Sequence, residues 1–417
     1  MIKRISYEPI KAHLNQKEIT LIVGPRQAGK TTLMQMLKKE LDDRGAKTVF
    51  LNLDIEADRP FFDSQQALLQ KIELEFGKNK GYVFMDEIQR KENAGIFLKG
   101  LYDMNLPYKL IVSVSGSVEL KEKVHESLAG RKRIFEISTL SFEEFVNYKT
   151  DYQYTHNLMN FFALHPHQST KHLHEYLNFG GYPRVVIADT ASEKQSIIAD
   201  IYQSYLEKDI AYLLNIQKTE LLTHLVKILS SQAGSLVNIS ELSSTLGLSV
   251  QTINDYLWYL EKTFIIRKVT PYFKNIRKEI TKMCLYYFID LGLKNYAIGQ
   301  FGSATHGLPA GFLFENFVYN NLYAHLNTAT SRIHFWRTQD KAAVDFILET
   351  ADEVMPIEVK YHLLQKPETT RSFKSFLNKY HPEKAYVVHL GKTFEDRYNN
   401  TRIIFASYFQ TIDLIKK

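Results

Sequence analysis

The sequence predicts a multidomain α/β protein, in which a parallel sheet with flanking helices precedes a helical segment, a small helix-turn-helix unit and a second α/β domain. Three observations predict this order. Residues 18–41 run from an apolar strand through a glycine-containing loop into a helix. Apolar residues recur at helical spacing in 238–262 before a strand-like stretch. Residues 311–390 indicate a helix, three strands, a helix and a strand, and 417 residues give room for two or three domains.

The composition excludes several classes of protein. A hydrophobic content of 45% is ordinary for a globular chain, and a net charge of +6 is compatible with nucleic acid without demanding it. The one cysteine, Cys284, excludes an internal disulfide and a cysteine-built metal site. No apolar run approaches the roughly 18 residues that span a bilayer. We therefore expect a cytoplasmic protein with no membrane partner.

The stretch "GPRQAGKT", residues 24–31, lies between the first strand and the first long helix, which is the context of a phosphate-binding Walker A loop. Successive backbone N–H groups and the helix start cradle phosphates, Lys30 reaches the β and γ oxygens, and the Thr31 hydroxyl binds magnesium. The predicted ligands are ATP and Mg²⁺. The predicted nucleotide-binding residues are Gly24, Pro25, Arg26, Gln27, Ala28, Gly29, Lys30, Thr31, Thr32 and, further along, Ser117.

The stretch "GYVFMDEIQ", residues 81–89, indicates a strand that ends in two acids. Asp86 is the expected Walker B residue, which holds the magnesium shell together with Thr31, and Glu87 polarises the attacking water. A strand at 47–54 intervenes between the two motifs. With a Glu directly after the Asp, this pattern is typical of additional-strand NTPases and predicts ATP hydrolysis.

Two further groups belong to the same predicted site. A fourth strand, 109–117, ends in Ser115 and Ser117, either of which can sense the γ-phosphate or simply cap a helix. After a predicted helix at 118–128, Arg131 precedes a fifth strand. A planar cation there can reach a neighbour's nucleotide and stabilise charge on the transferred phosphoryl group. The alternative is that Arg131 belongs to a solvated cluster of cations. Both a ring or dimer and a protein that acts as a single chain therefore stay open.

The middle of the chain is predicted to be helical from Leu140 to about 218, with a turn at Gly180. The histidine-rich stretch 165–174 indicates a solvated loop because its spacing is irregular, and zinc binding is the alternative. Next, "NISELSSTLGLSVQTINDYLWYLEKTFIIRKV", from Asn238, predicts a winged helix-turn-helix whose first helix Ser240 caps. Cations gather in its wing, residues 267–282, so DNA contact and a packing role between domains are both open.

The chain resembles a prokaryotic family of AAA-superfamily ATPases that join an ATPase core to a winged helix and a C-terminal, restriction-endonuclease-like domain of unknown function. The matching stretches include "GPRQAGKTTL", "FMDEIQ", "LAGRKRIFEISTLSFEEF", "FGGYPRVV", "YYFIDLGLKNY", "GFLFENFVYNNL" and "PIEVK". The resemblance covers nearly the whole chain. It implies a P-loop NTPase core with a parallel sheet at 1–150, a helical lid at 151–218, a winged helix at 219–284 and an α/β restriction-endonuclease-like domain at 285–417.

The last domain carries a candidate nuclease-like metal site. Glu358 and Lys360 share one strand face because side chains alternate, while Asp345 on the adjacent strand and Glu315 on a helix can complete an oxygen-rich site for Mg²⁺. In the family pattern a second acid stands where this sequence has Ala343. The alternative for these charged residues is an ion pair without metal.

Three functions are compatible with these residues. The first is an ATPase that couples nucleotide state to a nucleic-acid-binding C-terminal half. The second is a metal-dependent nuclease gated by ATP. The third is a signalling or scaffold NTPase with protein partners, and salt-dependent DNA binding separates it from the other two.

Overall fold

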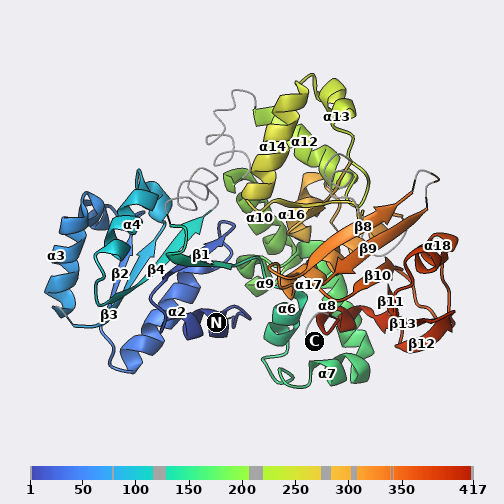
Figure 1. Ribbon diagram of the computed structural model, residues 1–417, viewed down its shortest axis with the longest axis horizontal. Helices are drawn as coiled ribbons and strands as arrows, with labels where there is room; N and C mark the ends of the chain where they lie inside the picture. The colour runs from blue at the N-terminus through green and yellow to red at the C-terminus, as the bar shows by residue number, and fades with distance from the viewer. Residues whose placement is uncertain are drawn as a thin grey trace. The chain divides into compact units, whose positions relative to one another are not determined.

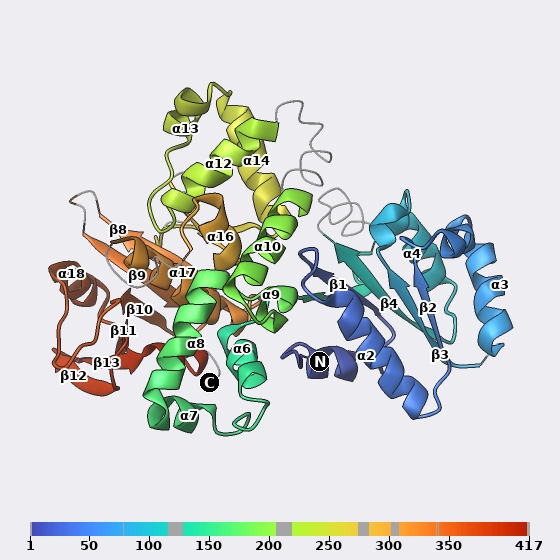
Figure 2. The same ribbon diagram turned by 180° about the vertical axis from the view of Figure 1, so that it is seen from behind.

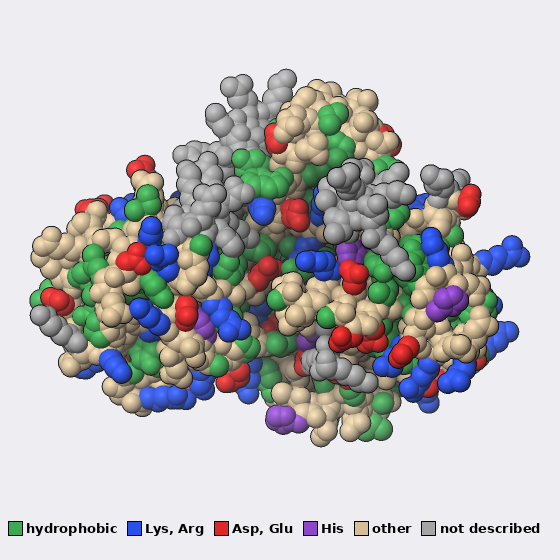
Figure 3. All heavy atoms as spheres, viewed as in Figure 1, with side chains coloured by type: hydrophobic (Ala, Val, Ile, Leu, Met, Phe, Trp, Pro, Cys, Tyr) green, Lys and Arg blue, Asp and Glu red, His purple; other side chains and the backbone are tan. Residues whose placement is uncertain are grey.

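The computed structural model describes residues 2–77, 79–115, 128–205, 219–273, 283–301, 308–338, 340 and 342–414 (Figure 1). Ser117, most of the predicted helix 118–128 and the wing residues 274–282 lie outside the described residues. The chain divides into two compact units, the first formed mainly by residues 1–140 and the second by most of the chain from Ser141 onward. None of the helices in the described ranges is long and apolar enough to cross a membrane. On the face drawn in Figure 3, hydrophobic side chains are interspersed with charged ones.

The first unit is built on a parallel sheet of five strands in the order β2-β3-β4-β1-β5. Its elements are α1 (Tyr7–His13), β1 (Ile19–Gly24), α2 (Lys30–Asp43), β2 (Thr48–Asn52), η1 (Glu56–Phe62), α3 (Gln65–Phe76), β3 (Gly81–Asp86), η2 (Ile88–Arg90), α4 (Ala94–Asp103), β4 (Tyr108–Ser115) and β5 (Lys132–Glu136). Helices α2 and α4 lie on opposite faces of the sheet (Figures 1 and 2). Strand β1 is buried throughout because helices cover both faces. The carboxyl ends of β1 and β3 flank the end of β4, which is where open α/β sheets bind ligands.

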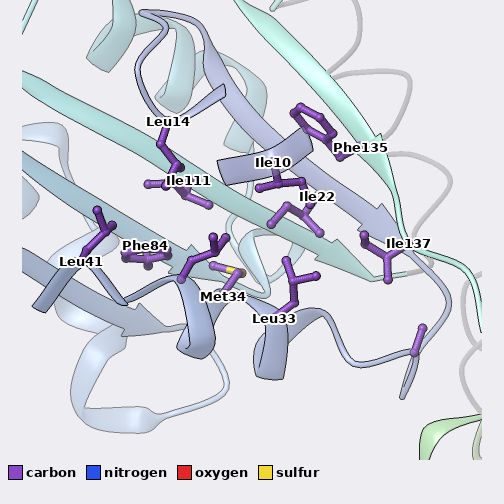
Figure 4. Packing of buried hydrophobic residues seen from close by; sticks show 12 residues of the cluster. Ile10, Leu14, Ile22, Leu33, Met34, Leu41, Phe84, Ile111, Phe135 and Ile137 are labelled. Carbon is purple, nitrogen blue, oxygen red and sulfur yellow. The ribbon is translucent and has the colours of Figure 1, made fainter. Parts of the chain in front are cut away.

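One face of this sheet is sealed by α1 and α2. Helix α2 buries Leu33, Leu37 and Leu41 at four-residue spacing, so that one stripe of the helix faces the strands. These side chains pack with Ile10 of α1 and with strand residues of the same core (Figure 4). The core therefore anchors the helix that begins at Lys30.

The second unit begins with helices α6 (Phe142–Lys149), α7 (Leu158–Leu164), α8 (Pro166–Phe179), α9 (Pro183–Ile187) and α10 (Ala191–Tyr202). The predicted turn at Gly180 is confirmed, because this residue has φ +72° and ends α8. The predicted histidine-rich loop is wrong. Residues 166–174 belong to α8, which starts at Pro166, and His172 is buried in it. Proline is well suited to the first turn of a helix, where its missing N–H costs nothing.

The helix-turn-helix segment comprises α12 (Thr219–Ser231), α13 (Ile239–Leu246) and α14 (Val250–Lys262), followed by the antiparallel strands β6 (Ile266–Val269) and β7 (Leu285–Phe288). Asn238, not Ser240, caps α13, because its Oδ1 accepts hydrogen bonds from the backbone N–H groups of Ser240 and Glu241. Ser240 already lies inside the first turn. Exposed Gln251 and Asp255 on α14 hydrogen-bond to each other. The element order matches the predicted one, and the winged-helix assignment stays a prediction.

The C-terminal part contains a mixed sheet of six strands in the order β12-β13-β11-β10-β9-β8. Its elements are α16 (Leu291–Ala297), α17 (Leu308–Ala324), β8 (Arg332–Arg337), β9 (Ala343–Glu349), β10 (Val354–Val359), α18 (Arg371–Tyr380), β11 (Lys384–His389), β12 (Phe394–Tyr398), β13 (Thr401–Ser407) and η4 (Tyr408–Ile412). The predicted succession of helix, three strands, helix and strand is present as α17 to β11. Phe373 and Phe376 of α18 pack on one face of the sheet with Val387, and Tyr319 of α17 meets Phe346 of β9.

Strand β9 contains a bulge where it pairs with β8. His334 lies opposite Ile347, but Trp336 lies opposite Val344, so Asp345 and Phe346 together face one residue of β8. A bulge re-aims the side chains beside it and is frequent near functional sites. It sets the direction of the Asp345 carboxylate.

Candidate functional site

The predicted phosphate-binding loop connects β1 to α2 in the first unit. Gly24 ends β1 beside the backbone of Ile137, whose N–H donates to the carbonyl of Val23 at 2.7 Å. A Cβ on Gly24 would lie 2.0 Å from the Ile137 carbonyl oxygen. Only glycine allows this close approach. At the other end of the loop, Gly29 has φ +94°, which few other residues adopt.

Helix α2 starts without a side-chain cap, and no acidic residue stands in its first turn. The first N–H groups of a helix have no partner within the helix, and the helix dipole adds partial positive charge there. This end of α2 is therefore suited to an anion.

Lys30 is buried, with 4% of its surface exposed, and its Nζ donates to the carbonyls of Gly24 (3.2 Å) and Pro25 (2.8 Å). Burial lowers the pKa of Lys30 to about 8, although the carboxylates of Glu87 and Asp86 oppose the shift. The ammonium is still mostly protonated at neutral pH. It can exchange its carbonyl partners for phosphate oxygens without leaving the loop.

Asp86, at the end of β3, is fully buried and accepts hydrogen bonds from three side chains. Thr31 Oγ1 donates to Oδ2 at 2.7 Å, Asn52 Nδ2 donates to the same oxygen at 3.4 Å, and Ser113 Oγ donates to Oδ1. The hydroxyl and carboxylate predicted to share a magnesium ion therefore already touch. Oxygen ligands of this kind are those that Mg²⁺ prefers, so the donor set fits the ion.

Glu87 follows Asp86 in a left-handed backbone conformation, with φ +57°, and its N–H donates to Ser113 Oγ at 3.0 Å. Its carboxylate oxygen Oε2 accepts hydrogen bonds from Gln89 Nε2 and from Ser115 Oγ. Gln89 Oε1 in turn accepts from the backbone N–H of Ser115 at 3.2 Å, which fixes the orientation of the amide. We call Glu87, Gln89 and Ser115 the glutamate clamp. It joins the ends of β3 and β4.

The remaining loop residues take different positions. Pro25 and Ala28 are buried, Arg26 and Gln27 are partly exposed, and Thr32 is exposed on the first turn of α2. An unpredicted residue braces the loop from outside. Arg4 donates through Nη1 to the Ala28 carbonyl and through Nη2 to the Ser138 carbonyl, both at 2.7 Å.

Arg131 lies at the opposite edge of the sheet from the loop. Its carbonyl accepts from the N–H of Ile19, the first residue of β1, whereas the loop follows the last residue of that strand. A strand of this length separates the two by roughly 17–20 Å. The Arg131 side chain is partly exposed, and its guanidinium binds both oxygens of Asp103, at 2.8 and 3.3 Å. Arg131 therefore does not serve the site of its own chain, and action on a neighbouring chain stays a prediction.

The predicted metal residues of the second unit form what we call the carboxylate cluster, Glu315, Asp345 and Glu358. Tyr287 Oη donates to Glu315, the Val359 N–H donates to Asp345 Oδ2 at 2.7 Å, and Lys360 Nζ lies 2.9 Å from Glu358 Oε1. Glu358 and Lys360 share one side of the chain, as the alternation predicted.

The carboxylates of the cluster perturb one another. Burial, and next the charge of Asp345, raise the pKa of Glu315 well above its usual range. Burial raises the pKa of Asp345 to about 6, with Glu358 adding to the shift and the Val359 N–H and Lys360 opposing it. Within the described part of the chain, however, no three Asp, Glu, His or Cys side chains stand close enough together to hold a metal ion. The predicted nuclease-like metal site therefore stays a prediction.

Sequence reasoning missed the residues that support the ATP-site acids. Ser113 precedes Ser115 by two positions, so both point to the same side of β4, and this alternation was the available signal. Gln89 lies in the quoted "MDEIQ" but in a turn whose shape was not predictable. Nothing in the sequence near Arg4 indicates its contact with the loop.

Three family models match separate stretches of the chain. Residues 16–146 match an AAA domain, residues 170–304 match a domain of unknown function (DUF8612), and residues 310–409 match another (DUF4143). An uncharacterized protein of Haemophilus influenzae is 26% identical over 370 residues, covering 86% of both chains. An uncharacterized protein of Mycobacterium tuberculosis is 24% identical over 386 residues, covering 92% of this chain and 79% of its own.

Among solved structures, the Aeropyrum pernix Orc1 protein in complex with DNA aligns with 71% of this chain and 92% of its own, at a TM-score of 0.32 and 10% identity. DnaA from Aquifex aeolicus bound to AMPPCP aligns with 62% of this chain and 88% of its own, at a TM-score of 0.27 and 15% identity. The AAA-domain match, the five-stranded parallel sheet and the phosphate-binding loop define the class of the first unit. It has the P-loop fold of an AAA-type ATPase.

Proposed function

We propose that this chain is a Mg²⁺-dependent ATPase that hydrolyses ATP and couples its nucleotide state to a nucleic-acid-binding C-terminal half. The hydrogen-bonded set at the carboxyl end of the sheet carries the first part of the proposal. Within it, Thr31 donates to Asp86 at the end of β3, Lys30 donates to carbonyls of its own loop, and the glutamate clamp holds the proposed base, Glu87. These side chains match the chemical tasks of phosphoryl transfer to water.

Each residue has one task in the proposed reaction. The first N–H groups of α2 and the Lys30 ammonium hold the phosphates, and Thr31 with Asp86 holds Mg²⁺, which supplies positive charge to the phosphate oxygens. Glu87 orients a water and takes its proton. Because two donors engage only Oε2 of Glu87, the second carboxylate oxygen is the one that faces the water.

Steady-state ATP turnover with and without Mg²⁺ tests the proposal, in wild type, Lys30→Ala and Glu87→Gln. We expect Glu87→Gln to lower kcat by about 10²- to 10⁴-fold, the usual contribution of a general base. Lys30→Ala should lower turnover as well, because it removes the ammonium that holds the phosphates. Lys39→Ala and Glu92→Gln, at exposed positions of the same unit, are the matched controls and retain turnover. Normal hydrolysis by Glu87→Gln would show that another group positions the water.

For the C-terminal half we propose the predicted division into a helical lid at 151–218, a winged helix at 219–284 and a restriction-endonuclease-like domain at 285–417. Adding single-stranded DNA, duplex DNA or RNA to the turnover assay tests the coupling. The expected result is stimulation by at least one of the three polymers.

A second candidate function, metal-dependent cleavage of nucleic acid, is supported by the raised pKa values of Glu315 and Asp345. A divalent cation would relieve the repulsion between these carboxylates. Manganese-dependent nicking of plasmid DNA, lost in Asp345→Ala and Lys360→Ala, is the result that this candidate requires. Nicking that persists in both variants would assign the activity to a contaminant.

A further inference from the structure

Helix α17 links the carboxylate cluster to a second feature of the same unit. Glu315, Tyr319 and Tyr323 follow one another at four-residue spacing and therefore lie along one face of the helix. The ring of Tyr287, which donates to Glu315, stacks on Tyr319 with centroids 4.7 Å apart. One turn of helix spans about 5.4 Å. The surface around Tyr323 is therefore about two turns from the cluster.

A pocket of about 380 Å³ opens beside these tyrosines. Its wall includes the cations Lys268 and Arg332, the hydroxyls of Thr270 and Thr328, and the rings of Tyr319 and Tyr323. No carboxylate belongs to the residues that line it. Lys268 and Arg332 are exposed, so both can meet a ligand from solvent.

Backbone pairing holds the two cations near each other although they are far apart in sequence. The chain leaving β6 runs along β8, where the Tyr272 N–H donates to the Phe335 carbonyl at 2.6 Å and the Phe335 N–H donates to the Thr270 carbonyl at 3.2 Å. Lys268 precedes this ladder on β6, and Arg332 begins β8. The spacing of the cations is therefore set by hydrogen bonds of the backbone, not by flexible loops.

One carboxylate, that of Glu349, lies beside the pocket, and the cations Lys268 and Arg332 outnumber it. Arg267 does not add to its wall but lies over the ring of Tyr323, with Cζ 3.5 Å from the centroid, and holds that ring in place. Glu349, which faces Arg332 in the β8–β9 ladder, has its carboxylate 3.4 Å from His334 Nε2. The Thr270 hydroxyl is hydrogen-bonded to His334 Nδ1 at 3.0 Å, so the two cations and Thr328 are the groups of the wall that suit a phosphate group.

We propose that this pocket binds a backbone phosphate of single-stranded nucleic acid whose neighbouring nucleotides pass the carboxylate cluster. The inference deepens the nucleic-acid-binding part of the proposed function and rests on it. A hollow of this volume accommodates about one nucleotide, whereas duplex DNA is contacted along a groove wide enough for a helix. The pocket and Glu315 lie along the same face of α17, so a strand held at the pocket can run toward the cluster.

Fluorescence anisotropy with a labelled oligothymidylate of about 12 nucleotides tests the proposal. The full-length wild type is compared with Lys268→Gln/Arg332→Gln and with a matched control, Lys366→Gln/Arg371→Gln, which removes two exposed cations from the same unit outside the pocket. We expect the pocket variant to bind about tenfold more weakly. Its salt dependence should also be shallower by about 0.7 in log Kd against log salt, since the two cations share one phosphate and each single-strand phosphate contributes about 0.7.

Two results would overturn the inference. One is an equal loss in the control variant, which would mean that net charge alone attracts the strand. The other is a wild type that does not bind the oligonucleotide at low salt. Inorganic phosphate, added as a competitor, shows whether the pocket binds free phosphate instead. ATP turnover is measured on the same samples. Oligonucleotide binding without ATP turnover would refute the proposed ATPase activity and support the proposed binding pocket. ATP turnover without pocket-dependent binding would refute the pocket and support the ATPase activity.

Discussion

Replacing Asp345 by Asn isolates the electrostatic cost of the carboxylate cluster. Asn preserves the size of the side chain, and its amide oxygen can still accept the Val359 N–H, but it cannot ionise. The ionised Asp345 is unfavourable in the folded protein because burial and the nearby Glu358 raise its pKa from 3.8 to about 6. The substitution should therefore stabilise the protein wherever Asp345 would be charged.

The size and the pH dependence follow from proton linkage. A difference between 3.8 and about 6 corresponds to about 3 kcal/mol at 1.36 kcal/mol per pKa unit, and screening by the solvent that reaches Asp345 reduces this to about 1–2 kcal/mol. The folded state keeps the proton longer than the unfolded state. The wild type is thus as stable as the variant below pH about 4 and loses stability as pH rises through about 6.

Urea unfolding from pH 4 to 8 measures this difference. Trp336 lies in the C-terminal core, so its fluorescence reports on the relevant unit once Trp258, the other tryptophan, is changed to Phe. Asp352→Asn, the same change at an exposed turn, is the control and should show no pH-dependent gain. If Asp345→Asn were less stable than the wild type at pH 8, the cluster would not be strained and the reasoning would fail.

Three further predictions concern the ATP site. Gln89→Ala should lower kcat about tenfold or more with little change in KM, because the glutamate clamp positions Glu87 without touching nucleotide; a change in KM alone would contradict this. Gly24→Ala should abolish nucleotide binding and lower the Tm, because its methyl group would collide with the Ile137 carbonyl, and calorimetric titration with ATP checks it. Arg131→Ala should lower kcat by about 10²-fold or more if it serves a neighbour, and mixing it with Lys30→Ala protein should restore part of the turnover; mixtures no more active than either variant would refute action between chains.

The ATP site was predictable where function depends on residues close together in sequence. The loop that ends in Lys30 and the pair Asp86–Glu87 each lie at the end of a strand, and chain order alone brings such ends to one edge of a parallel sheet. The hydrogen-bond partners that hold these residues in place were not predictable. Ser113 and Gln89 reach their partners only because the chain turns at Glu87. This residue has a positive φ angle, which is uncommon for a residue other than glycine.

The C-terminal site shows a different limit. Alternation correctly put Glu358 and Lys360 on one side, because that geometry is a property of any strand. The direction of Asp345 depends on a bulge against β8, and strand register across 334–347 depends on packing between distant segments. The pocket beside Tyr323 depends on the same kind of pairing, between the chain after β6 and β8. No local sequence pattern predicts this pairing.

The contact of Arg4 has a practical consequence for handling the protein. A single guanidinium near the amino terminus grips the carbonyl of Ala28 inside the phosphate-binding loop and that of Ser138 beyond β5. Trimming that removes Arg4 therefore removes a support of the phosphate-binding loop. Kinetic comparisons between preparations are meaningful only when their first few residues are identical.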